Sequence, residues 1–416
     1  MFRKSLTSMA AGACMVLAPV AVAETEASMV ADPVLIRWVN QVLLSNPEMQ
    51  AAEAAIEVSS GRLRAADQPV FNPELEFDYE RSEIDTTTGG IRQAIDWADK
   101  RGARTDVADF ELEAANAGLR FTRQRVATGL LQALADWHTA DQVVRVSEKR
   151  MTLMERFVRL AERRRKAGDL NQVELDLAYL AAAEAAFDQA NAHEGLIGAQ
   201  QAISVLAGAD TSDWPPFTGN LPAVDPDRLD VDHQLNELPA MRLALTRVAA
   251  MRATVEVRVR DQRPDPSIGF RVGKEDSDTL TGVTLSVPLF VRNTFSAEVD
   301  AANAELIQVE REAANRRRQL RAELIAAAQA YRNARRAWET WSASGAPRLS
   351  TRAELLDRLW QAGELDTTDY LVQLKQTLDT EISAIEQRGR MWRAWATWLA
   401  ASGRADQWLN LTGEKR

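Results

Sequence analysis

A long stretch without helix-breaking residues most constrains what this chain can fold into. Residues 105–166 contain no proline, and their only glycines are Gly118 and Gly129. Apolar residues recur there at steps of three, four and seven, which is the spacing of a coiled coil: Leu119, Val126, Leu130, Leu134, Trp137, Val144, Met151, Met154 and Val158. At about 1.5 Å per residue, one helix over this range would be roughly 90 Å long, which predicts an elongated molecule.

The hydrophobic period changes to two in the segments that separate the helical blocks. Apolar and polar residues alternate within residues 73–97 and again within residues 266–290. Each segment contains a polar stretch, 85–89 or 274–278, that is expected to be a loop. The sequence therefore predicts two β-hairpins, each with one apolar and one polar face. The residues expected on the apolar faces are Leu75, Phe77, Tyr79, Ile91, Ile95, Ile268, Phe270, Val272, Val283, Leu285, Val287 and Leu289.

The same arrangement occurs twice along the chain. Asn72-Pro73 precedes the first hairpin and Asp265-Pro266 precedes the second, an offset of 265 − 72 = 193. An Ala-Gly-acidic-Leu turn around Gly168 returns around Gly363, an offset of 363 − 168 = 195. Landmarks that keep a nearly constant spacing are the signature of a tandem duplication.

The duplication divides the chain into five parts. Residues 1–23 are a predicted signal peptide, and 24–208 form the first repeat. Residues 209–236, rich in proline and aspartate, read as a linker. The second repeat is expected over 237–403, which leaves 404–416 as a C-terminal tail.

The signal peptide is predicted from its own pattern. Arg3 and Lys4 precede an apolar run that ends in Ala21-Val22-Ala23, a small-x-small cleavage site. Cys14, the only cysteine, lies within this run, and Ala11 stands three residues before it. A lipoprotein signal has a branched aliphatic residue there, so lipid attachment is not expected. The mature chain would contain no cysteine.

Charge and motif content exclude several classes of protein. The net charge is −10, and it becomes −12 when the two cations of the signal peptide are removed. Such an acidic chain is a poor partner for nucleic acid, whose phosphates need Lys and Arg. His138, His193 and His233 are isolated, and no nucleotide-binding, nucleophile-elbow or zinc-protease motif is present. Neither an enzyme, nor a cofactor, nor a metal site is therefore expected.

The sequence leaves open whether the chain contacts a membrane. No apolar run of about 18 residues follows the signal peptide, so no transmembrane helix is expected. Four strands cannot close a barrel alone, so strands that meet lipid must be pooled by several chains. Two alternatives to membrane-spanning strands are a periplasmic adaptor with a coiled-coil hairpin and a soluble coiled-coil scaffold. The duplicated architecture argues against the adaptor, and a scaffold leaves the signal peptide and four amphipathic strands unexplained.

After the signal peptide, the chain twice repeats the order helix, hairpin, very long helix, Gly turn and return helix. This order resembles the TolC family of outer-membrane efflux proteins. The segment VPLFVRN at 287–293 is most similar to the heavy-metal, CzcC-type branch, although Thr294 stands where that branch often has glycine. The resemblance implies a mainly α fold with a small β part, assembled as a homotrimer. Each chain would give four strands to a twelve-stranded transmembrane β-barrel and its helices to a periplasmic α-barrel.

The role implied by this resemblance is a passive exit duct in the cell outer membrane. It would receive substrates, with heavy-metal cations among the candidates, from an inner-membrane pump of RND type and a periplasmic adaptor. The two Gly turns would be the tips that face the adaptor, through Gly168, Asp169, Leu170, Gly363, Glu364 and Leu365.

Acidic residues near these tips are candidates for a pore constriction, again by resemblance. Asp369 lies six residues after Gly363, and Glu174 is its equivalent in the first repeat; Asp366 and Asp176 lie close by. Rings of carboxylates attract cations. A second acidic position of the family is Val372 here. The alternative is that these carboxylates are solvated residues at helix starts.

Overall fold

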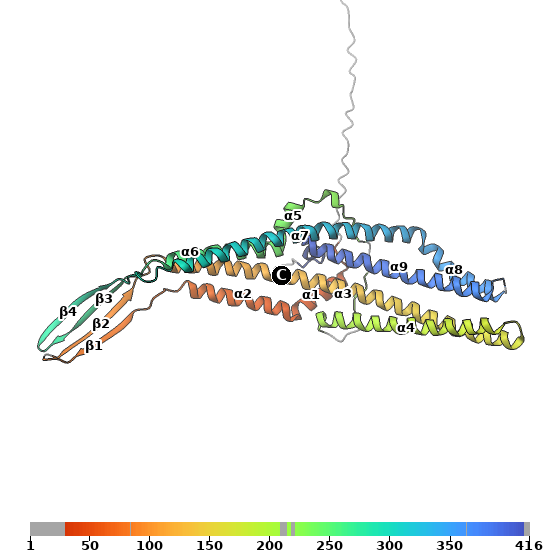
Figure 1. The fold of residues 1–416 in the computed structure, drawn as a ribbon, viewed down its shortest axis with the longest axis horizontal. Helices are drawn as coiled ribbons and strands as arrows, with labels where there is room; N and C mark the ends of the chain where they lie inside the picture. The colour runs from red at the N-terminus through yellow and green to blue at the C-terminus, as the bar shows by residue number, and fades with distance from the viewer. Residues whose placement is uncertain (1–29, 84, 209–213, 218–220, 363, 412–416) are drawn as a thin grey trace, which may run out of the picture.

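The computed structural model shows an elongated molecule with a sheet at one end and helical tips at the other (Figure 1). The predicted signal peptide lies outside the described residues. The described residues are 30–83, 85–208, 214–217, 221–362 and 364–411.

The elements follow the duplicated order that the sequence predicts. The first repeat contains α1 (Pro33–Ser45), α2 (Pro47–Ala66), β1 (Glu74–Glu80), β2 (Thr86–Ala94), α3 (Lys100–Ala167) and α4 (Gln172–Ala207). The second contains α6 (Pro239–Asp261), β3 (Ser267–Glu275), β4 (Asp278–Ser286), α7 (Ser296–Ser344), α8 (Ala346–Gln361) and α9 (Thr367–Ser402). The short elements are η1 (Pro226–Arg228), α5 (Val231–Glu237) and α10 (Ala405–Trp408).

The long helices confirm the length that the sequence predicts but differ between the repeats. Helix α3 is continuous over 68 residues. Its counterpart is divided into α7, with 49 residues, and α8, with 16. The division falls at Gly345, and Pro347 lies in the first turn of α8. Proline is accepted in a first turn but removes a hydrogen bond from a helix interior, so the second helix is interrupted here.

The four strands form one antiparallel sheet in the order β1-β2-β3-β4. The hairpin turns are tighter than expected, because residues 86–89 belong to β2, and 274, 275 and 278 belong to β3 and β4. The threonines at 86–88 are β-branched and extend the strand that was predicted to be a loop. The two hairpin loops are therefore shorter than the sequence predicts.

Three residues expected on strands lie just beyond them. Ile95 follows the last residue of β2, and Val287 and Leu289 follow the last residue of β4. Pro288 has no N–H group and cannot continue the ladder. Asp96 accepts hydrogen bonds from the backbone of the following helix, as described below. Ile95 still donates its N–H to the carbonyl of Pro266 at 2.8 Å, so one cross-strand hydrogen bond follows the end of β2.

The core lies in the helical part and has two large clusters. One surrounds the middle of the molecule and includes Trp392, Trp395 and Trp398 of α9 together with Leu130 and Leu134 of α3. The other lies toward the tips and includes Phe157, Trp360 and Tyr370. The tryptophans that recur at steps of three are therefore buried within the chain's own core.

Candidate functional site

The first helical tip is closed by backbone geometry that glycine permits. Helix α3 ends at Ala167, and Gly168 adopts a left-handed conformation with φ 88°. The N–H of Asp169 donates to the carbonyl of Arg164 at 2.9 Å, and the N–H of Gly168 to that of Arg165 at 3.1 Å. These bonds satisfy the last carbonyls of the helix. Leu170 is buried beneath the turn.

The second tip is described on both sides of Gly363, which itself lies outside the described residues. Helix α8 ends at Gln361, and the N–H of Glu364 donates to the carbonyl of Leu359 at 3.0 Å. Glu364 is exposed and Leu365 is half-buried. Both predicted tips therefore lie at the end of the molecule opposite the sheet (Figure 1).

Three of the four candidate carboxylates cap or brace a helix start. Asp366 accepts from the N–H of Asp369 at 2.9 Å. Glu174 forms a capping box with Asn171, and Asp176 accepts from the amide of Gln172 at 2.8 Å. A carboxylate at a helix N-terminus also suits the helix dipole. For these three, the structure gives a local role that does not require a pore.

Asp369 differs from the other three carboxylates. It is exposed, and its side chain makes no hydrogen bond or ion pair within the described part of the chain. It lies in the first turn of α9, where a negative charge suits the helix dipole, but no side chain of the described residues pairs with it. Of the four candidates, Asp369 is therefore the one whose carboxylate is available to a solute.

An aromatic cluster near the tips was not predicted from the sequence. Trp360 of α8 lies with its ring 4.8 Å from that of Phe157 on α3 and 4.7 Å from that of Tyr370 on α9. The guanidinium of Arg164 lies over Trp360 at 4.9 Å, a cation–π distance. We call Phe157, Trp360 and Tyr370 the tip cluster. The sequence alone does not predict this cluster, because its three residues lie on three different helices that only the fold brings together.

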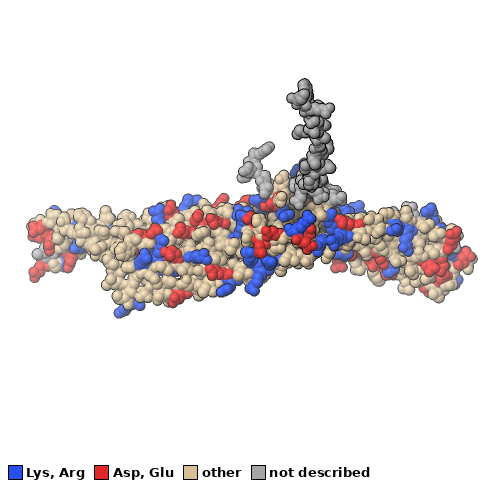
Figure 2. Space-filling model, turned by 90° about the horizontal axis from the view of Figure 1, so that it is seen from above, with Lys and Arg blue, Asp and Glu red and all other residues tan. Residues whose placement is uncertain are grey.

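At the opposite end, the sheet has one apolar face, as predicted. One row across the four strands pairs Leu75 with Ile91, Ile91 with Phe270 and Phe270 with Val283. All four side chains are exposed within the single chain. On the side seen in Figure 2, most of this end is uncharged, with acidic residues gathered at its extremity. A large exposed apolar face indicates contact with lipid or protein.

The other face of the sheet is polar. The neighbouring row pairs Glu76 with Gly90, Gly90 with Arg271 and Arg271 with Gly282. Arg92 forms an ion pair with Glu76. A side chain at Gly282 would meet Nε of Arg271 at 2.9 Å, so this glycine leaves room for the arginine to lie along the sheet. The two faces therefore suit different surroundings.

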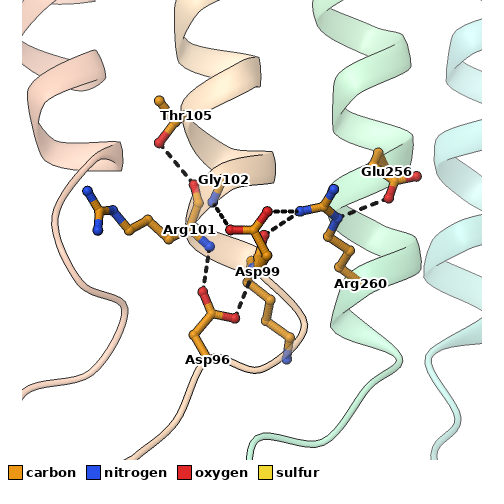
Figure 3. A network of polar contacts seen from close by, with 8 residues as sticks. Asp96, Asp99, Arg101, Gly102, Thr105, Glu256 and Arg260 are labelled. Atoms are coloured by element: carbon orange, nitrogen blue, oxygen red, sulfur yellow. Dashed lines mark hydrogen bonds and ion pairs between the residues drawn. The ribbon is translucent and has the colours of Figure 1, made fainter.

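A polar network fixes the sheet to the helices (Figure 3). Asp96 accepts from the N–H groups of Lys100 and Arg101, both at 2.7 Å. Asp99, with φ 53°, caps α3, and its Oδ2 atom accepts from Arg260 of α6 at 2.8 Å.

The same junction contains a shielded ion pair, in which Nζ of Lys100 lies 2.7 Å from Oδ2 of Asp265. Arg101 further pairs with Asp67 at 2.7 Å, which adds α2 to the contact. Charged groups of α2, α3 and α6 thus meet where the sheet begins.

No helix in the described part of the chain is long and apolar enough to cross a membrane. Among the same residues, no group of three or more His, Cys, Asp or Glu side chains is placed to hold a metal ion.

Comparison with known proteins gives a consistent result. The family described as "Outer membrane efflux protein" matches residues 38–209. The cobalt-zinc-cadmium resistance protein CzcC of Cupriavidus metallidurans is 26% identical over 258 residues, which is 60% of this chain and 61% of that protein. The chain thus aligns with about three fifths of this relative's length.

Solved structures share most of the fold. A membrane protein from Pseudomonas aeruginosa superposes with a TM-score of 0.75, at 18% identity, over 90% of this chain and 95% of that one. The Campylobacter jejuni CmeC outer membrane channel superposes with a TM-score of 0.76, at 14% identity, over 89% of this chain and 86% of that one. At such low identity, these likenesses establish the fold.

Proposed function

We propose that the chain, whose residues 38–209 match the outer membrane efflux protein family, forms the exit duct of a tripartite efflux system in the cell outer membrane. Substrates would reach it from an inner-membrane pump of RND type through a periplasmic adaptor. The duct catalyses no reaction of its own.

The observation that carries this proposal is the two-faced sheet at the end of a long helical body. An exposed row of Leu75, Ile91, Phe270 and Val283 suits lipid, and the Glu76–Arg271 row suits water. Open sheet edges are not tolerated in hydrocarbon, where every backbone polar group needs a partner. The strands of several chains must therefore be pooled, and three copies would give a twelve-stranded barrel.

Heavy-metal cations are the substrate class that we favour. The support is the CzcC relative, whose name describes resistance to cobalt, zinc and cadmium, together with the available carboxylate of Asp369. Three copies of Asp369 around a trimer axis would make a ring that attracts cations.

Gly168, Asp169, Leu170 and their second-repeat counterparts are proposed to face the adaptor. The support is their position at the end farthest from the sheet (Figure 1). A duct that meets a periplasmic partner must present that end to it.

Membrane fractionation with a heat-modifiability gel tests the proposal. We expect recovery in the outer membrane as a species near three times the monomer mass in unboiled samples, which boiling converts to monomer. A soluble periplasmic monomer would overturn the proposal and return the adaptor and scaffold hypotheses. A co-expressed adaptor and pump should then raise cadmium resistance only when the duct is present.

A further inference from the structure

We propose that His138 makes the linker between the two repeats sensitive to pH, holding it on the helical body while the imidazole is neutral and releasing it when the imidazole is protonated. The sequence predicts a linker over 209–236 from its proline and aspartate content. We call residues 214–217, 221 and 222 of this linker the strap. Large apolar side chains of the strap belong to the core in the middle of the molecule. The inference goes beyond the proposed function and does not depend on it.

The strap contacts both repeats at once. Its two aromatic side chains are buried, with Trp214 7% and Phe217 8% exposed. The ring of Trp214 packs edge-on against Trp137 of α3, with centroids 4.9 Å apart. The ring of Phe217 stacks on Trp392 of α9, with centroids 4.2 Å apart and planes inclined by 11°. A short piece of linker therefore bridges a helix of the first repeat and a helix of the second.

Side chains of two helices bind the backbone of the strap. Nε2 of His138 on α3 lies 2.9 Å from the carbonyl oxygen of Pro215. The hydroxyl of Tyr331 on α7 donates to the carbonyl of Pro222 at 2.7 Å. A carbonyl that loses its water on burial needs such a donor, because an unsatisfied polar group is costly. The position of the strap thus depends on the hydrogen-bonding state of His138.

The bond to Pro215 fixes the tautomer of the neutral ring. A carbonyl oxygen only accepts, so Nε2 of His138 carries the hydrogen. Nδ1 then has none, and this atom makes no hydrogen bond within the part of the chain that the structure describes. Protonation adds a hydrogen and a positive charge at Nδ1, where no acceptor among those residues receives them.

The surroundings of His138 also disfavour a second positive charge. The ring borders a cavity of about 250 Å³ between α3, α9 and the strap. Among the described residues that line it, Arg388 is the only other charged one, and its Nη2 donates to the carbonyl of Phe217 at 3.4 Å. The described strap residues carry no charge. Asp141 of α3 attracts a protonated ring, but it already pairs with Arg145 at 3.0 Å.

These contacts set the direction of the pH effect. Burial lowers the pKa of His138 below its ordinary value near 6.5, and the hydrogen bond to Pro215 and the charge of Asp141 oppose this only in part. The charge of Arg388 lowers the pKa further. The strap supplies part of the burial, since the ring of Phe217 lies 5.7 Å from the imidazole. Release of the strap exposes the imidazole, and its pKa returns toward the ordinary value. The released state therefore binds the proton more tightly, so docking weakens as pH falls through the ordinary pKa toward the docked one.

Cleavage by chymotrypsin after Phe217 measures release of the strap. The protease needs an extended and accessible segment, so a bond beside this buried side chain is cut only after the strap has left the core. The full chain in detergent is treated at several values between about pH 5.5 and 8. A synthetic peptide of residues 211–224 gives the cleavage rate of the free sequence at each pH. The ratio of the two rates follows the released fraction, because cleavage tracks the open population when reclosing is fast.

We expect this ratio to rise as pH falls below about 6.5, by up to about tenfold per pH unit until the docked ring is itself protonated. In His138→Gln the ratio should stay constant with pH, because the amide can donate to the same carbonyl but does not titrate. His193→Gln is the matched control. This exposed histidine of α4 lies 3.7 Å from Glu148 rather than against the strap, so its variant should respond to acid as the parent does.

A ratio that is independent of pH in the parent would overturn the proposal, whether or not the His138 variant can be purified. An equal rise in the parent and in His138→Gln would overturn it too, because another group would then be titrating. Both results leave the duct untouched, since membrane fractionation at a single pH reports assembly and not the position of the strap.

Discussion

The ring of Trp360 on α8 stacks on the ring of Tyr370 on α9, with centroids 4.7 Å apart and planes inclined by 15°. The same tryptophan packs on Phe157 of α3 and lies under the guanidinium of Arg164. It therefore joins the short helix α8 both to its own hairpin and to the hairpin of the first repeat. Trp360 is thus one of the buried side chains through which the second tip contacts the first.

Removing this side chain should loosen the second tip. Truncation of a buried tryptophan to alanine costs about 3–5 kcal/mol of folding free energy. Trp360→Ala should therefore speed amide exchange across residues 346–361 by roughly a hundredfold or more, which corresponds to the lower end of this energy range. Hydrogen–deuterium exchange of the detergent-solubilised protein measures this. Trp97→Ala, at a side chain 65% exposed, is the control and should leave exchange at the tips unchanged. Equal exchange in the Trp360 variant and the parent would contradict the role of the tip cluster.

The left-handed turn at the first tip predicts opposite effects for two glycine substitutions. Gly168→Ala forces an alanine to φ 88° and should destabilise the tip by about 1–2 kcal/mol. Gly118 lies within α3 with open space around it, so Gly118→Ala should stabilise the helix by roughly 0.5–1 kcal/mol. Urea unfolding of both variants measures these changes. The same sign for both would refute the argument from conformation.

The availability of the Asp369 carboxylate predicts a change in ion selectivity. If Asp369 lines the pore, Asp369→Asn should lower the cation preference of the reconstituted channel, read as a smaller reversal potential across a salt gradient. Asp366→Asn is the matched control, because asparagine caps a helix about as well as aspartate does. Unchanged selectivity in the Asp369 variant would remove this residue from the lining.

A buried carboxyl in the C-terminal segment predicts a pH dependence of stability. Burial raises the pKa of Asp406 above its ordinary value near 3.8, and the charge of Arg123 opposes this only in part. Its Oδ1 atom is buried without a hydrogen-bond partner among the described residues. The folded state thus holds the proton more tightly than the unfolded state, so this group lowers stability as pH rises from the unfolded pKa to the folded one.

The substitution Asp406→Asn should remove this contribution. Melting temperatures of variant and parent should be close at pH values below the ordinary pKa. They should diverge as pH rises, with the variant more stable at pH 7. A difference between the two proteins that stays constant with pH would show that ionisation of Asp406 has no part in it.

The duplicated architecture could be predicted because its signals are local or periodic. The heptad pattern of α3 reflects the side of one helix that is buried, and the alternation around Phe77 and Phe270 reflects the apolar and polar faces of single strands. Gly168 predicts a helix end because glycine readily adopts the left-handed conformation in which many helices end. Such features can be predicted without knowing which other elements pack against them.

Other features depended on contacts between distant segments. The alternation predicted that Ile95 and Leu289 lie on strands, but β2 ends at Ala94 and β4 at Ser286. Beyond these ends, Asp96 accepts from the backbone of the following helix and Pro288 has no N–H group. The tip cluster joins residues from three helices, with Phe157 and Trp360 more than two hundred positions apart. No spacing rule connects them, so only the fold could reveal their contact.

The interruption at Gly345 makes the two tips mechanically unequal. Helix α3 has an unbroken hydrogen-bonded ladder from the sheet to Gly168 and behaves as a rigid strut. Helix α8 is attached to α7 by a joint and is otherwise secured mainly by side-chain packing. An equal load on the two ends would bend the first very little and swing the second about Gly345.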